Sequence, residues 1–337
     1  TPVSAYLHAA AMVKAGIYLI ARFAPAFADT DPWRPIVIGL GIFTMLLGGF
    51  QAMRESDLKR ILAFGTVSQL GMLTVVLGYG ERNSALAGLA LLVGHALFKS
   101  ALFLIVGVID RQLSTRDIGE LSGVGRQAPT LATFSIIAIA SMAGVAPTVG
   151  FVAKEAALTS FLEGGASPAA LIPLVGILLG SALTAAYGIR FVWGAFWTKK
   201  DAAGAPLERT EWPDPPIGFL VAPVVLSGLT MVAGVAAPLV DAAIAGYADG
   251  IPLEEGGKEY HLALWHGWEP ALFLSLGSIA LGALLFWVTQ RRPSTTRILP
   301  FTANDVYNVT LRGIARVSVW TTSLTQRGSL PFYVGTI

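Results

Sequence analysis

The chain has 337 residues, of which 54% are hydrophobic and 13% are charged, and its mean hydropathy is +0.65. A soluble domain usually carries about 25% charged residues, so this chain lacks the polar side chains needed to cover a water-facing surface. The net charge of +2, without a run of lysines or arginines, excludes a nucleic-acid partner, and the lack of cysteine excludes disulfides and thiolate metal sites.

Lipid is the solvent that suits this composition, and the chain has apolar stretches long enough to cross it. A helix needs about 20 residues to span roughly 30 Å of hydrocarbon. Backbone groups in lipid must pair within the protein, which leaves helices or closed barrels, and these stretches are long and do not alternate strictly. We therefore predict an all-α polytopic membrane protein with eight spans, at residues 3–21, 35–53, 61–79, 85–109, 129–162, 169–194, 217–237 and 268–289.

The first span carries two ionisable residues, His8 and Lys14, and lacks the basic start and uninterrupted apolar middle of a signal peptide. Lys14 lies midway along the span, where a lysine costs about 2.5–3.5 kcal/mol on insertion scales. The far end of the chain, residues 330–337, resembles the start of another apolar segment. Since the chain also begins with threonine, we expect a fragment of a larger protein, truncated at both ends.

The fourth span has a second midway lysine, Lys99, and His95 lies four residues before it. Residues four apart share one face of a helix, so the two side chains are neighbours. An imidazole gains and loses protons near neutral pH, so this pair can pass a proton along where an isolated lysine would only hold one. Asp110, near the end of the same span, fits either a modulating role or a plain position at the membrane interface.

The fifth span, residues 129–162, is too long for one straight crossing and is interrupted by the sequence GVAPTVG at 144–150. Pro147 removes a backbone donor, and Gly144 and Gly150 loosen the chain on either side of it. We predict two half-helices joined by an unwound loop at membrane depth, an arrangement that marks ion sites in transporters. A simple proline kink is the alternative.

Lys154 follows this break and is the third lysine placed away from a span end. Its neighbour Glu155 points about 100° away around the helix, so we expect the two side chains to have different partners. Three such lysines together cost on the order of 8–10 kcal/mol before any partner is counted. Carboxylates or water must offset this cost, and structural ion pairs are the alternative to a proton path.

The loops alternate in positive charge. Loops on one side of the membrane contain only Arg22, Arg34, Arg82 and Lys258. The loops after the second, fourth, sixth and eighth spans contain Arg54, Lys59, Arg60, Arg111, Arg116, Arg126, Lys199, Lys200, Arg209, Arg291, Arg292 and Arg297. Because cytoplasmic loops carry the excess of lysine and arginine, we expect the N-terminal end of the chain to be cytoplasmic.

Beyond Pro300 the pattern changes to that of an amphipathic helix. Arg312, Arg316 and Arg327 lie outside a helical stripe formed by Val306, Val309, Val317, Trp320 and Leu324. We predict that this segment lies along the membrane surface or against neighbouring helices. A soluble amphipathic helix is the alternative.

Four motifs, in order along the first half of the chain, resemble those of a known family. They are SAYLHAAAMVKAG at 4–16, DLKRILAFGTVSQLG at 57–71, HALFKSALFL at 95–104 and GFVAKE at 150–155. They are similar to motifs of the antiporter-like membrane subunits that respiratory complex I shares with Mrp-type multisubunit Na⁺/H⁺ antiporters.

The resemblance implies a fold and a set of site residues. In that family the core helices form two inverted repeats, each with a broken helix, and a row of lysines and histidines carries protons across the membrane midplane. By resemblance, this chain is the second five-to-six-helix repeat at 1–195, additional transmembrane helices at 196–300 and a lateral helix at 301–330. The implied relay consists of Lys14, His95, Lys99 and Lys154, with His8, Glu155 and Asp110 as further relay or modulating residues.

Two departures distinguish the branches of that family. Complex I subunits of the L type usually carry an uncharged residue where Lys14 stands, and an additional histidine where this chain has Leu91. Both features, and the run VIDRQ at 108–112, are more similar to the Mrp A subunit.

We therefore favour a subunit of a multisubunit Na⁺/H⁺ antiporter in a prokaryotic cell membrane, with no enzymatic activity or cofactor of its own. The resemblance implies other membrane subunits as partners and H⁺ and Na⁺ as transported ions. No cluster of hard oxygen ligands for sodium stands out, so the sequence does not identify a metal site. The alternatives are an L-type proton-pumping subunit of NADH-quinone oxidoreductase and a non-conducting membrane scaffold.

Overall fold

The computed structural model describes residues 2–165, 167–200, 205–253, 257–290 and 303–325. Within these ranges the regular structure is helical, with two isolated β-bridges and no strand. The chain divides into two units, Thr1–Arg291 and Arg292–Ile337, which we describe separately. The all-α prediction is confirmed.

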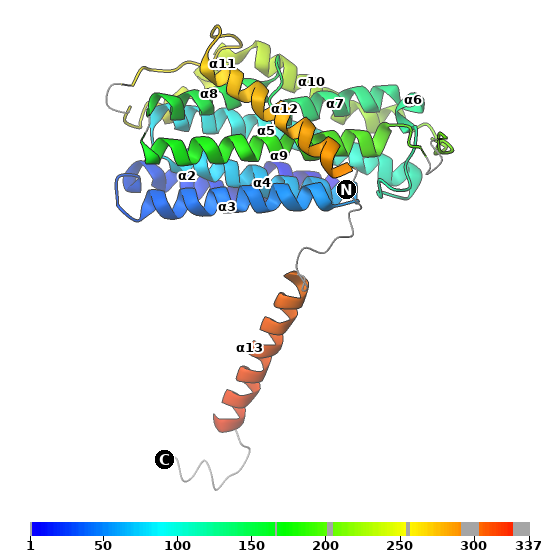
Figure 1. The fold of residues 1–337 in the computed structure, drawn as a ribbon, viewed down its shortest axis with the longest axis horizontal. Helices are drawn as coiled ribbons and strands as arrows, with labels where there is room; N and C mark the ends of the chain where they lie inside the picture. The colour runs from blue at the N-terminus through cyan, green and yellow to red at the C-terminus, as the bar shows by residue number, and fades with distance from the viewer. Residues whose placement is uncertain (1, 166, 201–204, 254–256, 291–302, 326–337) are drawn as a thin grey trace. The chain divides into compact units, whose positions relative to one another are not determined.

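Seven helices of the larger unit are long and apolar enough to cross a membrane, and Figure 1 shows long helices of this unit running beside one another. They match seven of the eight predicted spans. These are Tyr6–Phe27, α3 Trp33–Arg54, α4 Leu58–Gly78, α5 Arg82–Leu113, α9 Pro168–Phe196, α10 Ile217–Val235 and α12 Pro270–Gln290.

The eighth predicted span, at 129–162, is two shorter helices, α7 Pro129–Ala143 and α8 Val149–Glu163. Gly144 ends α7 with a φ of +81°, a left-handed conformation that favours glycine. A Cβ on Gly150 would lie 1.8 Å from the Ser141 carbonyl oxygen, so only glycine lets α8 start this close to the end of α7. The predicted pair of half-helices is confirmed, and the proline-kink alternative is wrong.

The first span is less regular than predicted. It consists of α1 Pro2–Ala5, a wide π-helical turn η1 Tyr6–Ala10, a tight 3-10 turn η2 Met12–Lys14 and α2 Ala15–Phe27. The residue between the two turns, Ala11, has φ −119° and ψ −76°, away from helical values. Such changes of winding inside a helix often occur at functional positions, and this one ends at the midway lysine.

Two short helices were not predicted: α6 Val124–Gln127 and α11 Ala237–Ala248. No helix was predicted over 237–248, because the span expected at 217–237 ends where α11 begins. Pro238 lies in the first turn of α11, where proline suits a helix start. Asp241 interrupts the apolar run there, which hides the helix from a reading based on hydropathy.

The loops after the second, fourth and sixth spans meet at one end of the bundle, in the parts that the structure describes. There, Ser56 Oγ donates to Asp117 Oδ2 at 3.3 Å, and the Thr210 backbone N–H donates to the Ser122 carbonyl at 2.9 Å. At the other end, Asn83 Nδ2 donates to Glu163 Oε2 at 3.1 Å. This arrangement agrees with the alternation of loops inferred from the spans.

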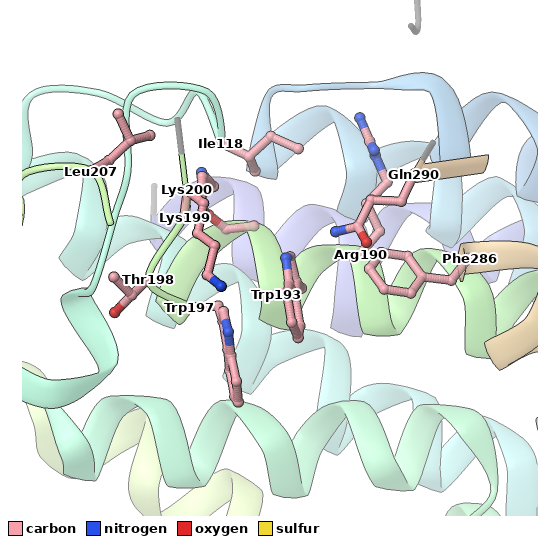
Figure 2. A pocket seen from close by; sticks show the side chains of 11 residues that line it. Ile118, Arg190, Trp193, Trp197, Thr198, Lys199, Lys200, Leu207, Phe286 and Gln290 are labelled. Atoms are coloured by element: carbon pink, nitrogen blue, oxygen red, sulfur yellow. Dashed lines mark hydrogen bonds between the residues drawn. The ribbon is translucent and has the colours of Figure 1, made fainter. Parts of the chain in front are cut away.

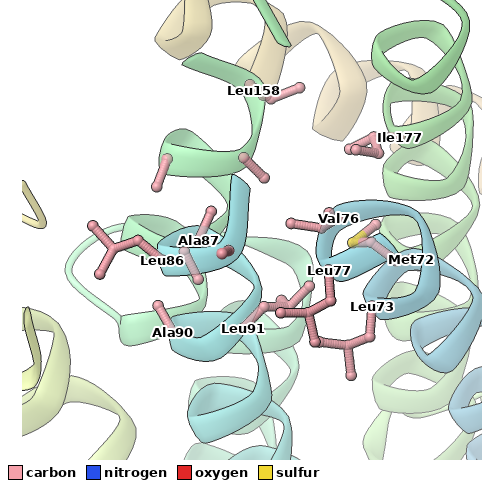
Figure 3. Close-up of a cluster of buried hydrophobic side chains, with 14 of the residues drawn as sticks. Met72, Leu73, Val76, Leu77, Leu86, Ala87, Ala90, Leu91, Leu158 and Ile177 are labelled. Carbon is pink, nitrogen blue, oxygen red and sulfur yellow. The ribbon is translucent and has the colours of Figure 1, made fainter. Parts of the chain in front are cut away.

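Two apolar clusters fill the bundle, and a polar layer separates them. One cluster includes Met72 to Leu77 of α4, Leu86 to Leu91 of α5 and much of α8 (Figure 3). The other includes Leu58 to Leu62 of α4 and Phe98 to Ile109 of α5. Between them on the same helices and on α9 lie buried polar side chains, which we call the polar layer: Thr66, Ser68, Gln69, His95, Lys99, Ser181 and Thr184.

The smaller unit contains α13 Ala303–Thr325, and its described side chains, at 305–323, are all exposed. The predicted helix is confirmed within the bounds 303–325, with Val306, Val309, Val317 and Trp320 at least half exposed. Its lateral position stays a prediction. The outer parts of the predicted segment, including Arg327, lie outside the described residues.

Candidate functional site

Lys99 is fully buried in the polar layer. Its amino group donates to the Leu62 carbonyl at 3.3 Å and lies 5.9 Å from the centre of the Tyr187 ring. A Cβ on Gly65 would come within 3.0 Å of the Lys99 amino nitrogen, so that glycine leaves the room the ammonium occupies. Among the described residues, no carboxylate lies within ion-pair distance of Lys99.

His95 lies one turn from Lys99 on α5 and is also fully buried. Its ring meets Phe98 edge to face, with centroids 5.6 Å apart. Neither ring nitrogen has a hydrogen-bond partner in the part of the chain that the structure describes. Since a buried polar group normally has a partner in the protein or in ordered water, His95 is an unusual side chain to keep there for stability alone.

Lys14 lies beside the same stretch of α5, because its amino group donates to the Leu92 carbonyl at 3.2 Å. The charges of both Lys14 and Lys99 act on His95. The structure therefore brings together three of the four relay residues that the sequence indicates, although they are 81 to 85 residues apart along the chain from Lys14.

Lys154 lies on α8, which packs against α5. It is 3% exposed, and its amino group donates to the carbonyl of Ala143 at the end of α7. This carbonyl is one of those that the end of a helix leaves without an intrahelical partner. The broken helix thus supplies the acceptor for the lysine that follows it.

Glu155 faces away from Lys154, as expected, and meets a residue that sequence reasoning missed. Its Oε2 lies 4.0 Å from Nδ1 of His266, in the loop before α12. A histidine in a polar loop carries no sequence signal for this contact, because it lies 111 residues further along the chain.

The two remaining candidates have more ordinary surroundings. The His8 ring stacks on Phe103 with centroids 5.4 Å apart. Asp110 lies near the C-terminal end of α5, where Arg116 Nη1 approaches its Oδ2 to 3.7 Å. The geometry of Asp110 is that of an interfacial ion pair.

A cavity near the ends of α9 and α12 lies apart from these residues. It has a volume of about 610 Å³ and is lined at the C-terminal ends of α9 and α12 by residues that include Arg190, Trp193, Lys199 and Phe286 (Figure 2). No relay candidate lines it. Among the described residues, no group of three or more His, Asp or Glu side chains is placed to hold a metal ion.

Comparison with known proteins gives one family match. The family model described as "NADH:quinone oxidoreductase/Mrp antiporter, TM" matches residues 1–180. The match covers the irregular first span, the broken helix and the polar-layer residues on α4 and α5.

Two curated relatives show how much of a longer protein the chain represents. It is 37% identical to the A/B subunit of a probable K⁺/H⁺ antiporter of Rhizobium meliloti. The 294 aligned residues cover 86% of this chain and 29% of that protein. It is 33% identical over 362 residues to the A subunit of the Na⁺/H⁺ antiporter of Alkalihalophilus pseudofirmus, which covers 99% of this chain and 44% of that protein. The chain spans less than half the length of either relative.

Solved structures also match this chain to part of a longer chain. The Mrp complex from Dietzia sp. DQ12-45-1b matches 99% of this chain and 36% of the matched chain, with 34% identity and a TM-score of 0.85. The archaeal membrane-bound sulfane sulfur reductase matches with a TM-score of 0.72 but 20% identity, which shows the shared fold alone.

Proposed function

The chain belongs to the membrane-domain family of NADH:quinone oxidoreductase and Mrp antiporter subunits, and from that premise we propose that it carries protons as part of an A-type subunit of a multisubunit cation/proton antiporter. Protons move along Lys14, His95, Lys99 and Lys154. In this proposal residues 1–195 are the second inverted repeat, and the protein works as a transporter and not as an enzyme. Other membrane subunits are its partners.

The proposal rests on three lysines whose partners are backbone carbonyls, where a structural role would call for carboxylates. Lys99 and Lys154 are buried and Lys14 is half-buried. Lys14, Lys99 and Lys154 each donate to a backbone carbonyl. A carbonyl oxygen satisfies one donor of an ammonium group and cannot neutralise its charge. A purely structural site would pair a buried cation with an anion, whereas a relay needs groups that gain and lose a proton easily.

The order of transfer follows from the contacts. Each protonated group raises the cost of protonating its neighbour, because like charges repel. Lys99 lies one turn from His95 on α5, and Lys14 contacts the same stretch of α5 at Leu92, so a charge on either lysine disfavours a proton on His95. Coupled steps of this kind move charge along the polar layer without large displacements of the backbone.

The exchanged cation is Na⁺ in this proposal, with K⁺ as the competing ion. The name of the Alkalihalophilus pseudofirmus relative gives Na⁺ and that of the Rhizobium meliloti relative gives K⁺. The excess of lysine and arginine in alternate loops supports a cytoplasmic N-terminal end for the chain, and in this proposal the protein lies in the cell membrane of a bacterium.

The test is cation-driven proton movement in inverted membrane vesicles that contain the full-length protein with its partner subunits. We expect Na⁺ to dissipate a preformed pH gradient in the wild type, and Lys154→Met to reduce the rate at least about tenfold, a loss that corresponds to about 1.4 kcal/mol. Lys200→Met, at an exposed lysine, serves as the matched control. Proton movement that requires NADH and quinone and ignores both cations would overturn the proposal.

A further inference from the structure

Glu155 is a buried carboxylate that the relay described above does not use. It is 1% exposed and lies one position after Lys154 on α8. Its Oε2 has no hydrogen-bond partner among the described residues. A basic group, Nδ1 of His266, lies 4.0 Å from that oxygen.

His266 has a defined tautomer. Its Nε2 lies 3.0 Å from the His261 carbonyl oxygen, which can only accept a hydrogen bond. Nε2 therefore carries the hydrogen in the neutral ring, and Nδ1 carries the lone pair. The Tyr260 hydroxyl lies 3.2 Å from Nδ1, and the two rings stack with centroids 4.7 Å apart.

The surroundings of this ring favour proton exchange at Nδ1. The Glu155 carboxylate raises the pKa of His266 above its ordinary value, with Glu269 adding to the effect and burial opposing it. Burial raises the pKa of Tyr260, so its hydroxyl keeps its proton and acts as a donor to neutral Nδ1. Nδ1 is thus the one position on the ring that gains and loses a proton.

The loop that contains His266 also reaches from the end of the bundle to the depth of Glu155. Glu155 lies eight residues before the end of α8, which is about 12 Å along the helix axis. The segment between α11 and α12 brings the His266 ring to this depth while 20% of the side chain stays exposed. Arg82 anchors this segment, since its guanidinium donates to Asp249 at 2.8 Å and to the Tyr260 carbonyl at 3.2 Å.

We propose that His266 is the residue through which the relay exchanges protons with water at this end of the bundle, with Glu155 as its buried proton partner and Tyr260 as the positioning residue. The inference rests on the proposed function and adds the residues through which protons leave the relay. In the outward step, neutral Nδ1 takes the proton of the Glu155 carboxyl group, which leaves a carboxylate and an imidazolium. Water at the exposed edge then takes the Nδ1 proton and restores the neutral ring, and the inward step is the reverse.

The Glu155–His266 contact is longer than a closed hydrogen bond. Charge-assisted hydrogen bonds between nitrogen and oxygen are about 2.7–2.9 Å long, so the pair must shorten to exchange a proton. At 4.0 Å the Glu155 oxygen keeps a free acceptor position that faces the ring. When Glu155 and His266 approach each other by about 1 Å, a proton can pass between them, and when they move apart again the transferred proton stays on its new group.

Rescue by added bases tests the proposal in the full-length protein with its partners, in inverted vesicles. We expect His266→Ala to slow Na⁺-driven proton movement about tenfold or more, and millimolar imidazole to restore much of the rate. Pyrazole has a similar ring shape but is too weak a base to carry a proton near neutral pH, so it should restore nothing. A ring that only fills space would be replaced equally well by both compounds.

Two variants make every outcome decisive. Lys200→Met, at an exposed lysine outside this loop, is the control, and we expect it to retain the wild-type rate. Lys154→Met reports on the proposed function itself. If Lys154→Met stops exchange and His266→Ala does not slow it, the exit through His266 is wrong while the relay stands; if Lys154→Met leaves exchange intact, the relay is wrong.

Discussion

The side chain of Lys99 has few contacts that a neutral residue of the same length would lose. It makes one hydrogen bond to a carbonyl and lies over the Tyr187 ring. A net hydrogen bond is worth about 1 kcal/mol, whereas a charge without an anionic partner costs several kcal/mol to bury. Stability therefore gives little reason to keep a lysine at this position.

Lys99→Met is the variant that separates the two roles. We expect the free energy of unfolding to fall by no more than about 1 kcal/mol, while cation-driven proton movement falls at least about tenfold. Thermal unfolding in detergent and transport in vesicles measure the two quantities. A variant that loses stability and transport in parallel would point to a structural role for the lysine.

His266 gives a pH dependence whose sign follows from its surroundings. Because the Glu155 carboxylate raises its pKa in the folded protein above 6.5, the folded state binds the proton more tightly than the unfolded state. The resulting stabilisation is complete below pH 6.5 and is lost as the pH rises through the folded-state pKa.

The matching measurement compares the wild type with His266→Gln. We expect the wild type to unfold at a higher temperature at pH values below 6.5, and the difference to shrink over about two pH units above that value. A difference that grows with pH would contradict the raised pKa. The Glu155→Gln variant should lose the pH dependence in the same way.

At the scale of the element, the break between α7 and α8 positions Lys154. Gly144 has a φ of +81°, and a Cβ there would lie 2.8 Å from Cε and 2.9 Å from the amino nitrogen of Lys154. Any side chain at this position both strains the backbone and displaces the lysine from the Ala143 carbonyl. The glycine is therefore part of the site.

Gly144→Ala has a matched control in the same chain, because Gly165 has a φ of +67° and open space around its missing Cβ. Both alanine variants lose about 1 kcal/mol to the left-handed backbone. We expect only Gly144→Ala to reduce proton movement, by about tenfold or more, while Gly165→Ala loses stability alone. Equal transport by the two variants would show that the position of Lys154 is not critical.

The sequence indicates the elements that depend on length and composition. The seven long helices and the break at Gly144 follow from apolar runs and from the backbone limits of proline and glycine. The turns before Lys14 and the helix α11 do not, because the first depends on packing against α5 and the second is a short segment containing Asp241.

Some residues of the site can be found from the sequence and others cannot. The three lysines stand out because charge in an apolar run is rare, so Lys14, Lys99 and Lys154 are visible in the sequence. Their carbonyl partners and His266 are not, since a backbone acceptor has no sequence signal and a loop histidine is unremarkable without its contact to Glu155.

At the scale of the whole molecule, the alternation of basic loops predicts an orientation in the membrane that can be measured. The chain contains no cysteine, so an introduced cysteine is the only thiol within it. We expect Lys200→Cys to react with a membrane-impermeant maleimide only in inverted vesicles, and His261→Cys only in intact cells. The reverse pattern, or labelling of both from one side, would contradict the proposed topology.

Proton transfer along the relay depends on water in the polar layer between the two apolar clusters. The buried His95 nitrogens have no partner among the described residues, and Lys14, Lys99 and Lys154 have carbonyls in place of carboxylates. The most direct measurement is an electron cryo-microscopy map of the intact complex at a resolution that shows ordered water. We expect water that joins His95 to Lys99 and continues toward Lys154, with each neighbour within hydrogen-bond distance; apolar side chains that close this path, with no water between the amino groups, would contradict proton transfer along it.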